Sequence, residues 1–241
     1  PMTAEIVGIS LSFKQDTGFY IPVVYPEKKN NNFGDDDLNV CLSLLKDILE
    51  NSKVRKIGQN IKYDLLIFSR FGINITGIYF DTMIAAHILN PSARSYKLDT
   101  LSLEYLNYSM VPIEDLIGKG KDQITMDHVS LDKVSYYASE DADISLQLAK
   151  LFIPRLEENN QMEFFQKIEM PLINVLMQME KEGVEFKCNS HIGSDINVED
   201  IIKNYDAVVL ACGSEEPRDL NIPGRNLDGI YFAMDFLKFL F

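Results

Sequence analysis

Alternating apolar and polar residues predict a β-hairpin near the start of the chain. Apolar side chains occupy every second position across residues 7–13, which is the period of a half-buried strand. Residues 14–18 are turn-forming types, and residues 18–25 return to a strand-like pattern, so the two segments are expected to pair antiparallel. Pro22 lacks the N–H that a sheet ladder uses, and we expect it at a sheet edge or bulge.

The next stretch alternates between helical and strand-like segments. A polar loop at residues 28–37 is followed by helical spacing of apolar residues over 42–49. A short strand then ends at Gly58, and residues 60–71 have the pattern of a helix that Gly72 would stop. This order predicts a strand-to-helix turn just after Gly58.

A second strand-to-helix turn is predicted around Asp81. Residues 75–80 have strand character, and the helix after Asp81 should end at Leu89 because an Asn-Pro pair follows. Asp81 has two interpretations, a helix N-cap or a catalytic acid, and the capping preference of aspartate favours the N-cap. Asp99 is expected to cap a further short helix in the same way.

Helical periodicity dominates from residue 130 to residue 182. A long helix opens near Ser130 and should reach Pro154 or just beyond, where proline is expected to kink or break it. A last helix covers roughly residues 162–182, with Pro171 interrupting it and Gly183 ending it.

Composition indicates a globular α/β chain without membrane segments. The 241 residues are 46% apolar and 10% aromatic, which is enough to bury a sizeable core. The sequence has no apolar run of membrane-spanning length and no signal-peptide pattern. Three scattered cysteines, Cys41, Cys188 and Cys212, form no disulfide or zinc pattern and fit a reducing cytoplasm.

The net charge of −13 argues against a non-specific duplex binder. The charge is unevenly distributed, because residues 51–121 carry nine basic and six acidic side chains, whereas residues 122–187 carry six and thirteen. A mildly basic middle beside an acidic segment suits the handling of single-stranded nucleic acid. A chance fluctuation along a solvated surface is the alternative.

The first candidate site is the stretch KIGQNIKYD at residues 56–64. It places two side-chain amides, Gln59 and Asn60, and one carboxylate, Asp64, at the predicted turn after Gly58. Functional residues are often carried on irregular backbone that rigid elements hold in place. The alternative is that Asp64 only favours a helix N-terminus through the helix dipole.

The second candidate site is the stretch YYASEDADISLQL at residues 136–148. Tyr137 and Asp141 are four residues apart and therefore share one face of the predicted helix. A phenol one turn from a carboxylate can orient a water while the carboxylate holds a hard cation such as magnesium. Glu140, Asp141 and Asp143 can also be interpreted as a solvated acidic face.

Five segments in this order and spacing give the chain a specific resemblance: GQNIKYD, FDTMIAAHILNP, IGKGKDQIT, YASEDADISLQL and IEMPLINVLMQMEKEGV. Residues 1–187 resemble the proofreading 3'-5' exonuclease domain of bacterial DNA polymerase I. The resemblance implies a ribonuclease-H-like α/β fold, with a mixed sheet flanked by helices. It also implies metal-dependent hydrolysis of the 3'-terminal phosphodiester of single-stranded DNA.

The resemblance assigns roles to six residues. Asp64 matches the acid of the second family motif, and Tyr137 and Asp141 match the third. Asp64 and Asp141 would be ligands to two divalent cations, Mg or Mn, and Tyr137 would orient the attacking water. The substrate-binding residues would be Gln59, Asn60 and Tyr63, which fall where the family contacts the frayed 3' end.

The chain departs from the family at the first motif. The D-x-E pair of the family's first strand has no match, so two of four carboxylates are missing, and we expect a fold without that central strand and with little nuclease activity. Two alternatives remain, a non-catalytic nucleic-acid-binding or scaffold module and a ribonuclease of the same superfamily. The polymerase domain does not follow residue 187, and we expect a monomer.

Residues 188–241 change character and resemble an internal fragment of the small subunit of NADPH-dependent glutamate synthase. The resembling segments are residues 205–211, 217–220, 223–225 and 232–235. The fragment lacks a G-x-G-x-x-G, so we expect it to bind neither flavin nor NADPH. It is too short to rebuild a dinucleotide-binding domain, and we expect a short α/β fragment, with a possible strand at 206–211, rather than an independent domain.

Overall fold

The structure, a computed structural model, describes residues 4–26, 36–120, 123–184, 187–188 and 190–208. The chain divides into two compact units, Pro1–Val184 and Glu185–Phe241. Within the described residues, the first unit holds every strand and every helix except α9 (Val198–Asn204). The candidate site residues all belong to this first unit.

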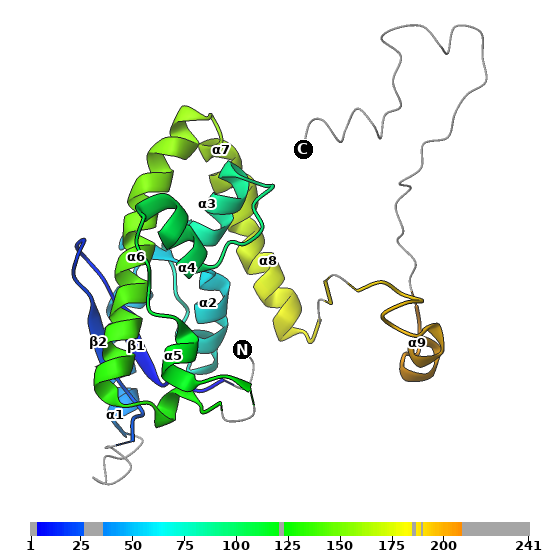
Figure 1. Cartoon of the computed structure of the whole chain (residues 1–241), viewed down its shortest axis with the longest axis horizontal. Helices are drawn as coiled ribbons and strands as arrows, with labels where there is room; N and C mark the ends of the chain where they lie inside the picture. Colours follow the sequence, from blue (N-terminus) through cyan, green and yellow to red (C-terminus); the bar gives the residue numbers. More distant parts are fainter. Residues whose placement is uncertain (1–3, 27–35, 121–122, 185–186, 189, 209–241) are drawn as a thin grey trace, which may run out of the picture. The chain divides into compact units, whose positions relative to one another are not determined.

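The predicted hairpin is present in the first unit. β1 (Gly8–Leu11) pairs antiparallel with β2 (Phe19–Pro22), and Pro22 ends its strand opposite Gly8. This end position suits a residue that cannot donate a ladder hydrogen bond. Figure 1 shows the hairpin beside the long helix α6 (Leu131–Glu158), which contacts both strands.

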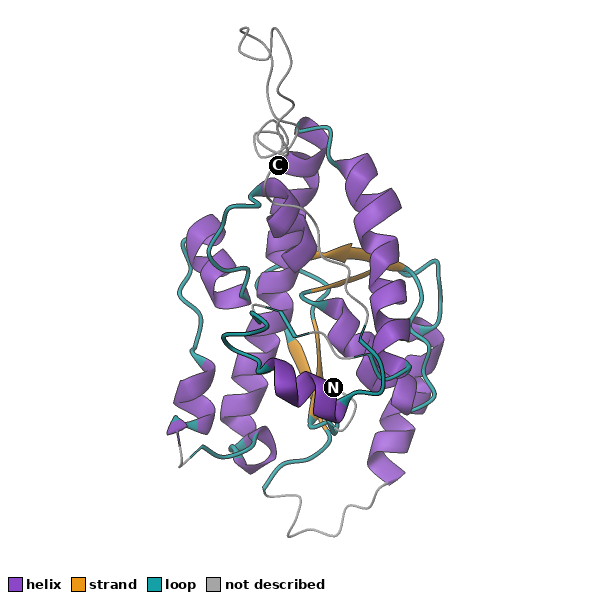
Figure 2. Ribbon diagram, turned by 90° about the vertical axis from the view of Figure 1, so that its right-hand side faces the viewer, coloured by secondary structure: helices purple, strands orange, loops and turns teal. Residues whose placement is uncertain are grey.

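The other two strands form a separate parallel pair. β3 (Lys56–Gly58) and β4 (Ile78–Asp81) are joined through α2 (Ile61–Arg70), and Gly58 lies opposite Asp81. The described strands are thus divided between one antiparallel and one parallel two-stranded sheet. This arrangement confirms an α/β fold that contains both kinds of pairing. Figure 2 shows helices on either side of the strands.

The helices follow the predicted order. The remaining helical segments of the first unit are α1 (Asp36–Leu49), α3 (Thr82–Leu89), α4 (Leu98–Leu101), a π-helical turn (Ser102–Leu106), α5 (Ile113–Ile117), a 3-10 turn (Met126–His128), α7 (Met162–Phe164), a second π-helical turn (Phe165–Glu169) and α8 (Met170–Lys181). The expected stop of α2 is also present, since Gly72 has a φ of 72°.

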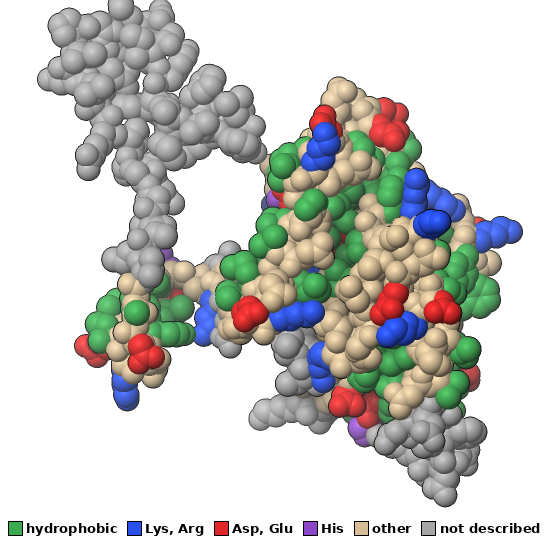
Figure 3. Space-filling view, turned by 180° about the vertical axis from the view of Figure 1, so that it is seen from behind, with side chains coloured by type: hydrophobic (Ala, Val, Ile, Leu, Met, Phe, Trp, Pro, Cys, Tyr) green, Lys and Arg blue, Asp and Glu red, His purple; other side chains and the backbone are tan. Residues whose placement is uncertain are grey.

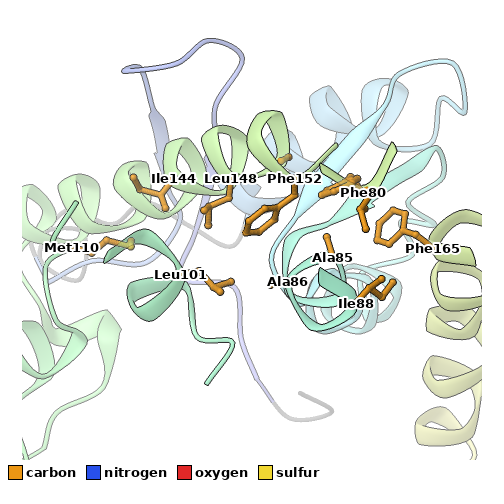
Figure 4. Close-up of a cluster of buried hydrophobic side chains, with 12 residues drawn as sticks. Phe80, Ala85, Ala86, Ile88, Leu101, Met110, Ile144, Leu148, Phe152 and Phe165 are labelled. Atoms are coloured by element: carbon orange, nitrogen blue, oxygen red, sulfur yellow. The ribbon is translucent and has the colours of Figure 1, made fainter. Parts of the chain in front are cut away.

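One face of α6 forms the main hydrophobic core. Leu148, Phe152 and Leu156 on this face are fully buried. Figure 4 shows its side chains directed toward Phe80 at the end of β4 and toward the residues of α3. The rings of Phe80 and Phe165 lie 4.7 Å apart, which ties the segment after α7 to the same core.

Two prolines lie in the long helical segments. α6 reaches four residues past Pro154, to Glu158, as the predicted extent allowed, and of the predicted kink or break at that proline the break is absent. Pro154 is exposed, while Phe152 and Leu156 on either side of it are held in the core, and this packing keeps the helix continuous. Pro171 is the second residue of α8, at the point where the π-helical turn Phe165–Glu169 passes directly into that helix, so the helical backbone changes form beside the proline but does not stop there.

Two other predictions need correction or lie partly outside the described residues. Asp99 is not an N-cap, because α4 begins at Leu98 after an extended Lys97, and the Asp99 carboxylate instead accepts from the N–H of Thr100 at 2.6 Å. Most of the predicted loop at 28–37 lies outside the described residues, and α1 already begins at Asp36.

The second unit contains one described helix, α9, and an isolated bridge between Ile192 and Ile196. Residues 206–208 of the strand predicted at 206–211 do not form a strand, and residues 209–211 lie outside the described residues. Among the helices in the described part of the chain, none combines the length and the apolar character needed to cross a membrane.

Candidate functional site

Three of the predicted site residues lie at the solvent-accessible start of α2. Tyr63 and Asp64 belong to its first turn and Asn60 precedes it, and all three are exposed, whereas Ile61 and Leu65 are buried. A nucleic acid or a cation could therefore reach each of them.

Asp64 is accessible but crowded by protein. Desolvation by the surrounding atoms and the nearby Asp81 carboxylate raise the pKa of Asp64 to about 7, although its own backbone N–H partly opposes the shift. The Asp64 side chain remains accessible to solvent, so a positively charged ligand could reach it.

Asp81 lies at the centre of the turn that carries these residues. Its carboxylate is 1% exposed and accepts hydrogen bonds from four backbone N–H groups, those of Asn60 (3.3 Å), Ile61 (2.7 Å), Met83 (2.9 Å) and Ile84 (3.2 Å). Burial raises the pKa of Asp81, and the four N–H groups oppose that rise. The prediction that Asp81 is the N-cap of α3 is confirmed. The hydrogen bonds from Asn60 and Ile61 at the start of α2 were not predicted.

Gln59 is held differently from the other amide. Its side-chain nitrogen donates to the carbonyl of Tyr96 at 2.8 Å, and its side-chain oxygen accepts from the hydroxyl of Thr82. The hydroxyl of Thr82 also contacts the carbonyl of Gly58 at 3.1 Å. The Gln59 side chain is therefore engaged within the protein, whereas Asn60 is exposed.

The second candidate pair lies on α6. Tyr137 donates a hydrogen bond to Asp141, and both side chains are half-buried. Desolvation, together with the charges of Glu140 and Asp99, raises the pKa of Asp141 to about 7. Desolvation and the adjacent Asp141 charge raise the pKa of the Tyr137 phenol, which stays protonated at neutral pH.

The neighbouring acids of α6 have structural partners. Glu140 is buried and accepts from the hydroxyl of Tyr108 (2.8 Å) and the N–H of Val111 (2.9 Å). Asp143 accepts from the N–H of Asp16 in the hairpin turn (2.9 Å) and from Gln147 (2.7 Å). The acidic cluster is therefore not a uniformly solvated face.

Among the described residues, no group of three or more His, Cys, Asp or Glu side chains is placed to hold a metal ion. Asp64 interacts electrostatically with Asp81, and Asp141 interacts with Glu140 and Asp99.

The sequence patterns did not predict that Asp81 lies near Asp64 or that Asp99 lies near Asp141. For Asp81 the sequence did contain a signal, because the strands before α2 and before α3 each lead directly into a helix. If two such strands pair in parallel, their carboxyl ends lie side by side.

Charge on the molecular surface is mixed. Figure 3 shows basic and acidic side chains interspersed on one face, with hydrophobic side chains between them and no broad patch of one sign among the described residues drawn there.

Part of the sequence is similar to a protein family and to curated relatives. A protein-family model described as 3'-5' exonuclease matches residues 1–157. DNA polymerase I of Rhizobium leguminosarum is 33% identical over 198 residues, covering 76% of this chain and 19% of the relative. DNA polymerase I of Borreliella burgdorferi is 35% identical over 187 residues, covering 76% of this chain and 19% of the relative. The chain thus spans about a fifth of the length of these curated relatives.

Solved structures agree with the fold. Brucella melitensis NrnC has a TM-score of 0.50 at 18% identity, covering 61% of this chain and 69% of that protein. A structure described as the apo form of the nuclease has a TM-score of 0.56 at 16% identity, covering 77% of this chain and 81% of that protein. At these identities the likeness concerns the fold alone.

Proposed function

Because the chain belongs to the 3'-5' exonuclease family, we propose that residues 1–187 form a proofreading-type exonuclease domain that acts on the 3' end of single-stranded DNA. The observation that carries the proposal is the match of the 3'-5' exonuclease family model to residues 1–157, a range that contains Asp64, Tyr137 and Asp141. Both carboxyls have their pKa raised to about 7, so both charges are penalised in the metal-free protein. A bound cation would remove that penalty, which is the behaviour expected of metal ligands.

Asp64 and Asp141 would hold divalent cations, Mg or Mn. Magnesium is commonly bound by one or two carboxylates, with water and substrate phosphate completing the shell, and accessible carboxylates of this kind fit that chemistry. The cations would supply charge stabilisation and an activated water for phosphodiester hydrolysis. Partial exposure of both side chains leaves room for a phosphate to approach.

Tyr137 would act through its hydroxyl oxygen. The phenol is protonated at neutral pH and donates its proton to Asp141, which leaves the oxygen beside that carboxylate able to accept a hydrogen bond from water. We propose that it orients the attacking water there.

The start of α2 would bind the terminal nucleotides. Tyr63 is 43% exposed and can stack on a base, and Asn60 can donate and accept hydrogen bonds beside it. Gln59 would act mainly by holding the turn, because both ends of its amide already have protein partners.

We further propose that the 241-residue chain by itself hydrolyses DNA slowly or not at all. The D-x-E pair that the family resemblance calls for has no match in the sequence, and Asp64 and Asp141 supply two of four expected carboxylates. Two carboxylates can bind a cation, but two cations held for phosphodiester cleavage require more ligands.

The test is calorimetric titration of Mn²⁺ into the purified chain and into an Asp64→Ala, Asp141→Ala double variant. Saturable binding that the double variant loses is the expected result. An Asp132→Asn variant, which removes an exposed carboxylate from the first turn of α6, is the control and should bind Mn²⁺ like the unchanged chain. Equal binding by all three proteins would refute the assignment of Asp64 and Asp141.

A nuclease assay separates the substrate classes. Oligonucleotides of one sequence, made as DNA and as RNA and labelled at the 5' end, would be incubated with the chain and Mn²⁺. We expect the DNA strand to be shortened from its 3' end slowly or not at all. Faster shortening of the RNA would favour the ribonuclease alternative, and binding of either strand without cleavage would favour a scaffold module.

We propose that residues 188–241 are a fragment without activity of its own. Residues 209–241, which carry most of the resemblance to the glutamate synthase small subunit, lie outside the described residues. Purified protein should show no flavin absorbance, before or after incubation with flavin nucleotide and desalting. Retained yellow colour would contradict this proposal.

A further inference from the structure

The helix that carries Asp64 begins without a cap of its own. Asn60 occupies the N-cap position of α2 with a left-handed backbone (φ 55°, ψ 47°), and its side chain makes no capping hydrogen bond. The first N–H groups of a helix have no partner within the helix and need one elsewhere. At α2, the N–H groups of Asn60 and Ile61 donate to the Asp81 carboxylate.

The same carboxylate caps a second helix. One oxygen of Asp81, Oδ1, accepts from Met83 and Ile84 at the start of α3 and from Asn60, whereas the other, Oδ2, accepts from Ile61. The parallel register explains how one side chain can do both, because Gly58 and Asp81 lie side by side where β3 and β4 end. Asp81 therefore joins the N-termini of α2 and α3.

Thr82 adds further contacts to the same turn. Its hydroxyl reaches the carbonyl of Gly58 and the side chain of Gln59, and Gln59 is in turn fixed to Tyr96. Asp81 and Thr82, at the junction of β4 and α3, therefore hold the three consecutive residues before α2, residues 58–60, by hydrogen bonds. The exposed residues of α2, Tyr63 and Asp64, follow within one turn.

We propose that Asp81 is a positioning residue for Asp64: by capping α2 from the neighbouring strand, it sets the first turn of that helix and the direction of its metal-binding side chain. The inference rests on the proposed function of Asp64. It goes beyond the N-cap of α3, because a residue that capped α3 alone would leave α2 and Asp64 unaffected. Asp81 does not itself contact metal or substrate in this assignment.

The variant Asp81→Asn separates the two caps. An asparagine can keep an oxygen where Oδ1 accepts from Met83 and Ile84, but its NH₂ group cannot accept the N–H of Ile61. We expect the Ile61 amide to exchange its hydrogen with solvent at least ~10-fold faster, while the Met83 and Ile84 amides keep their protection. We expect Mn²⁺ affinity to fall by about 10-fold or more, the range for residues that orient metal ligands.

The readouts distinguish positioning from a purely structural role. Thermal unfolding monitors stability in the same samples, and Asp132→Asn is again the charge-matched control. Loss of stability and of Ile61 protection with unchanged Mn²⁺ affinity would overturn the inference while leaving the proposed function intact. Lost Mn²⁺ affinity with Met83 and Ile84 still protected would support it.

A measurement on the unchanged protein covers the case in which the variant does not fold. The Ile61 amide should exchange as slowly as the capped amides of α3, because its acceptor is a buried carboxylate. Fast exchange at Ile61 would overturn the inference without any variant. If the unchanged protein binds no Mn²⁺, the proposed function fails, and positioning of a metal ligand fails with it even where Ile61 is protected.

Discussion

Replacing Asp141 by asparagine should make the metal-free protein more stable at high pH than at low pH, relative to the unchanged chain. The folded protein raises the pKa of this carboxyl from 3.8 to about 7. Between these values, the folded state holds a proton that the unfolded chain has already released. Stability contributed by the protonated carboxyl is therefore complete below pH 3.8 and is lost as the pH rises through 7.

The size of the effect follows from the two pKa values. Linkage between pKa values of 3.8 and about 7 predicts that the folded protein loses about 2.5 kcal/mol between pH 5 and pH 8. Asp141 is half-buried, and screening by solvent reduces the expected loss to about 2 kcal/mol. Asparagine does not ionise, so the variant should not show this part of the pH dependence.

The assay is urea unfolding in EDTA at pH 5, 6.5 and 8. The unfolding free energy of Asp141→Asn minus that of the unchanged chain should increase by about 2 kcal/mol from pH 5 to pH 8. A change in packing caused by the substitution shifts this difference equally at every pH. A difference between Asp141→Asn and the unchanged chain that stays constant from pH 5 to pH 8 would refute the reasoning.

Two predictions concern the framework that carries the site. Phe152→Ala should cost about 3–5 kcal/mol of unfolding free energy in urea, because this ring is fully buried in the core. Lys150→Ala on the exposed side of α6 should leave the transition unchanged, and equal effects would contradict the packing. Glu140→Ala should cost about 2–4 kcal/mol, since Tyr108 and the Val111 N–H lose their acceptor. Glu140→Gln keeps one acceptor oxygen and should cost about half as much by the same assay; equal losses would argue against the two hydrogen bonds.

The order of elements was predictable because it depends on local patterns. The hairpin, α2, α3 and the start of α6 near Ser130 each follow from periodicity, capping or glycine placement within a few residues. The sequence predicted a kink or a break at Pro154, and the break is absent for a non-local reason, because core packing on both sides of the proline holds the helix together. The prediction that Asp99 is an N-cap failed for a local reason, because α4 begins at Leu98 and the N-cap position is occupied by Lys97.

The site was only partly predictable for a related reason. Motif spacing could place Tyr137 and Asp141 on one face, and their hydrogen bond is present. Spacing could not show that the Gln59 side chain is occupied by Thr82 and Tyr96, because those partners lie more than twenty residues away. For Asp81, capping one helix and joining two helices look identical along the sequence, and only the parallel register distinguishes them.

The acids of α6 show how structural contacts fix a candidate site from outside it. Successive helical residues are rotated by about 100°, so Glu140 and Asp143, three residues apart, lie only about 60° apart around the helix, and Asp141 points about 100° away from Glu140 on the other side. Glu140 binds the segment around Val111, and Asp143 binds the hairpin turn at Asp16. A rotation of α6 about its axis would break one of these contacts, so together they fix where Asp141 points. Two of the acids thus supply the rigidity that a metal ligand requires of its support, and Asp141 remains beside Tyr137.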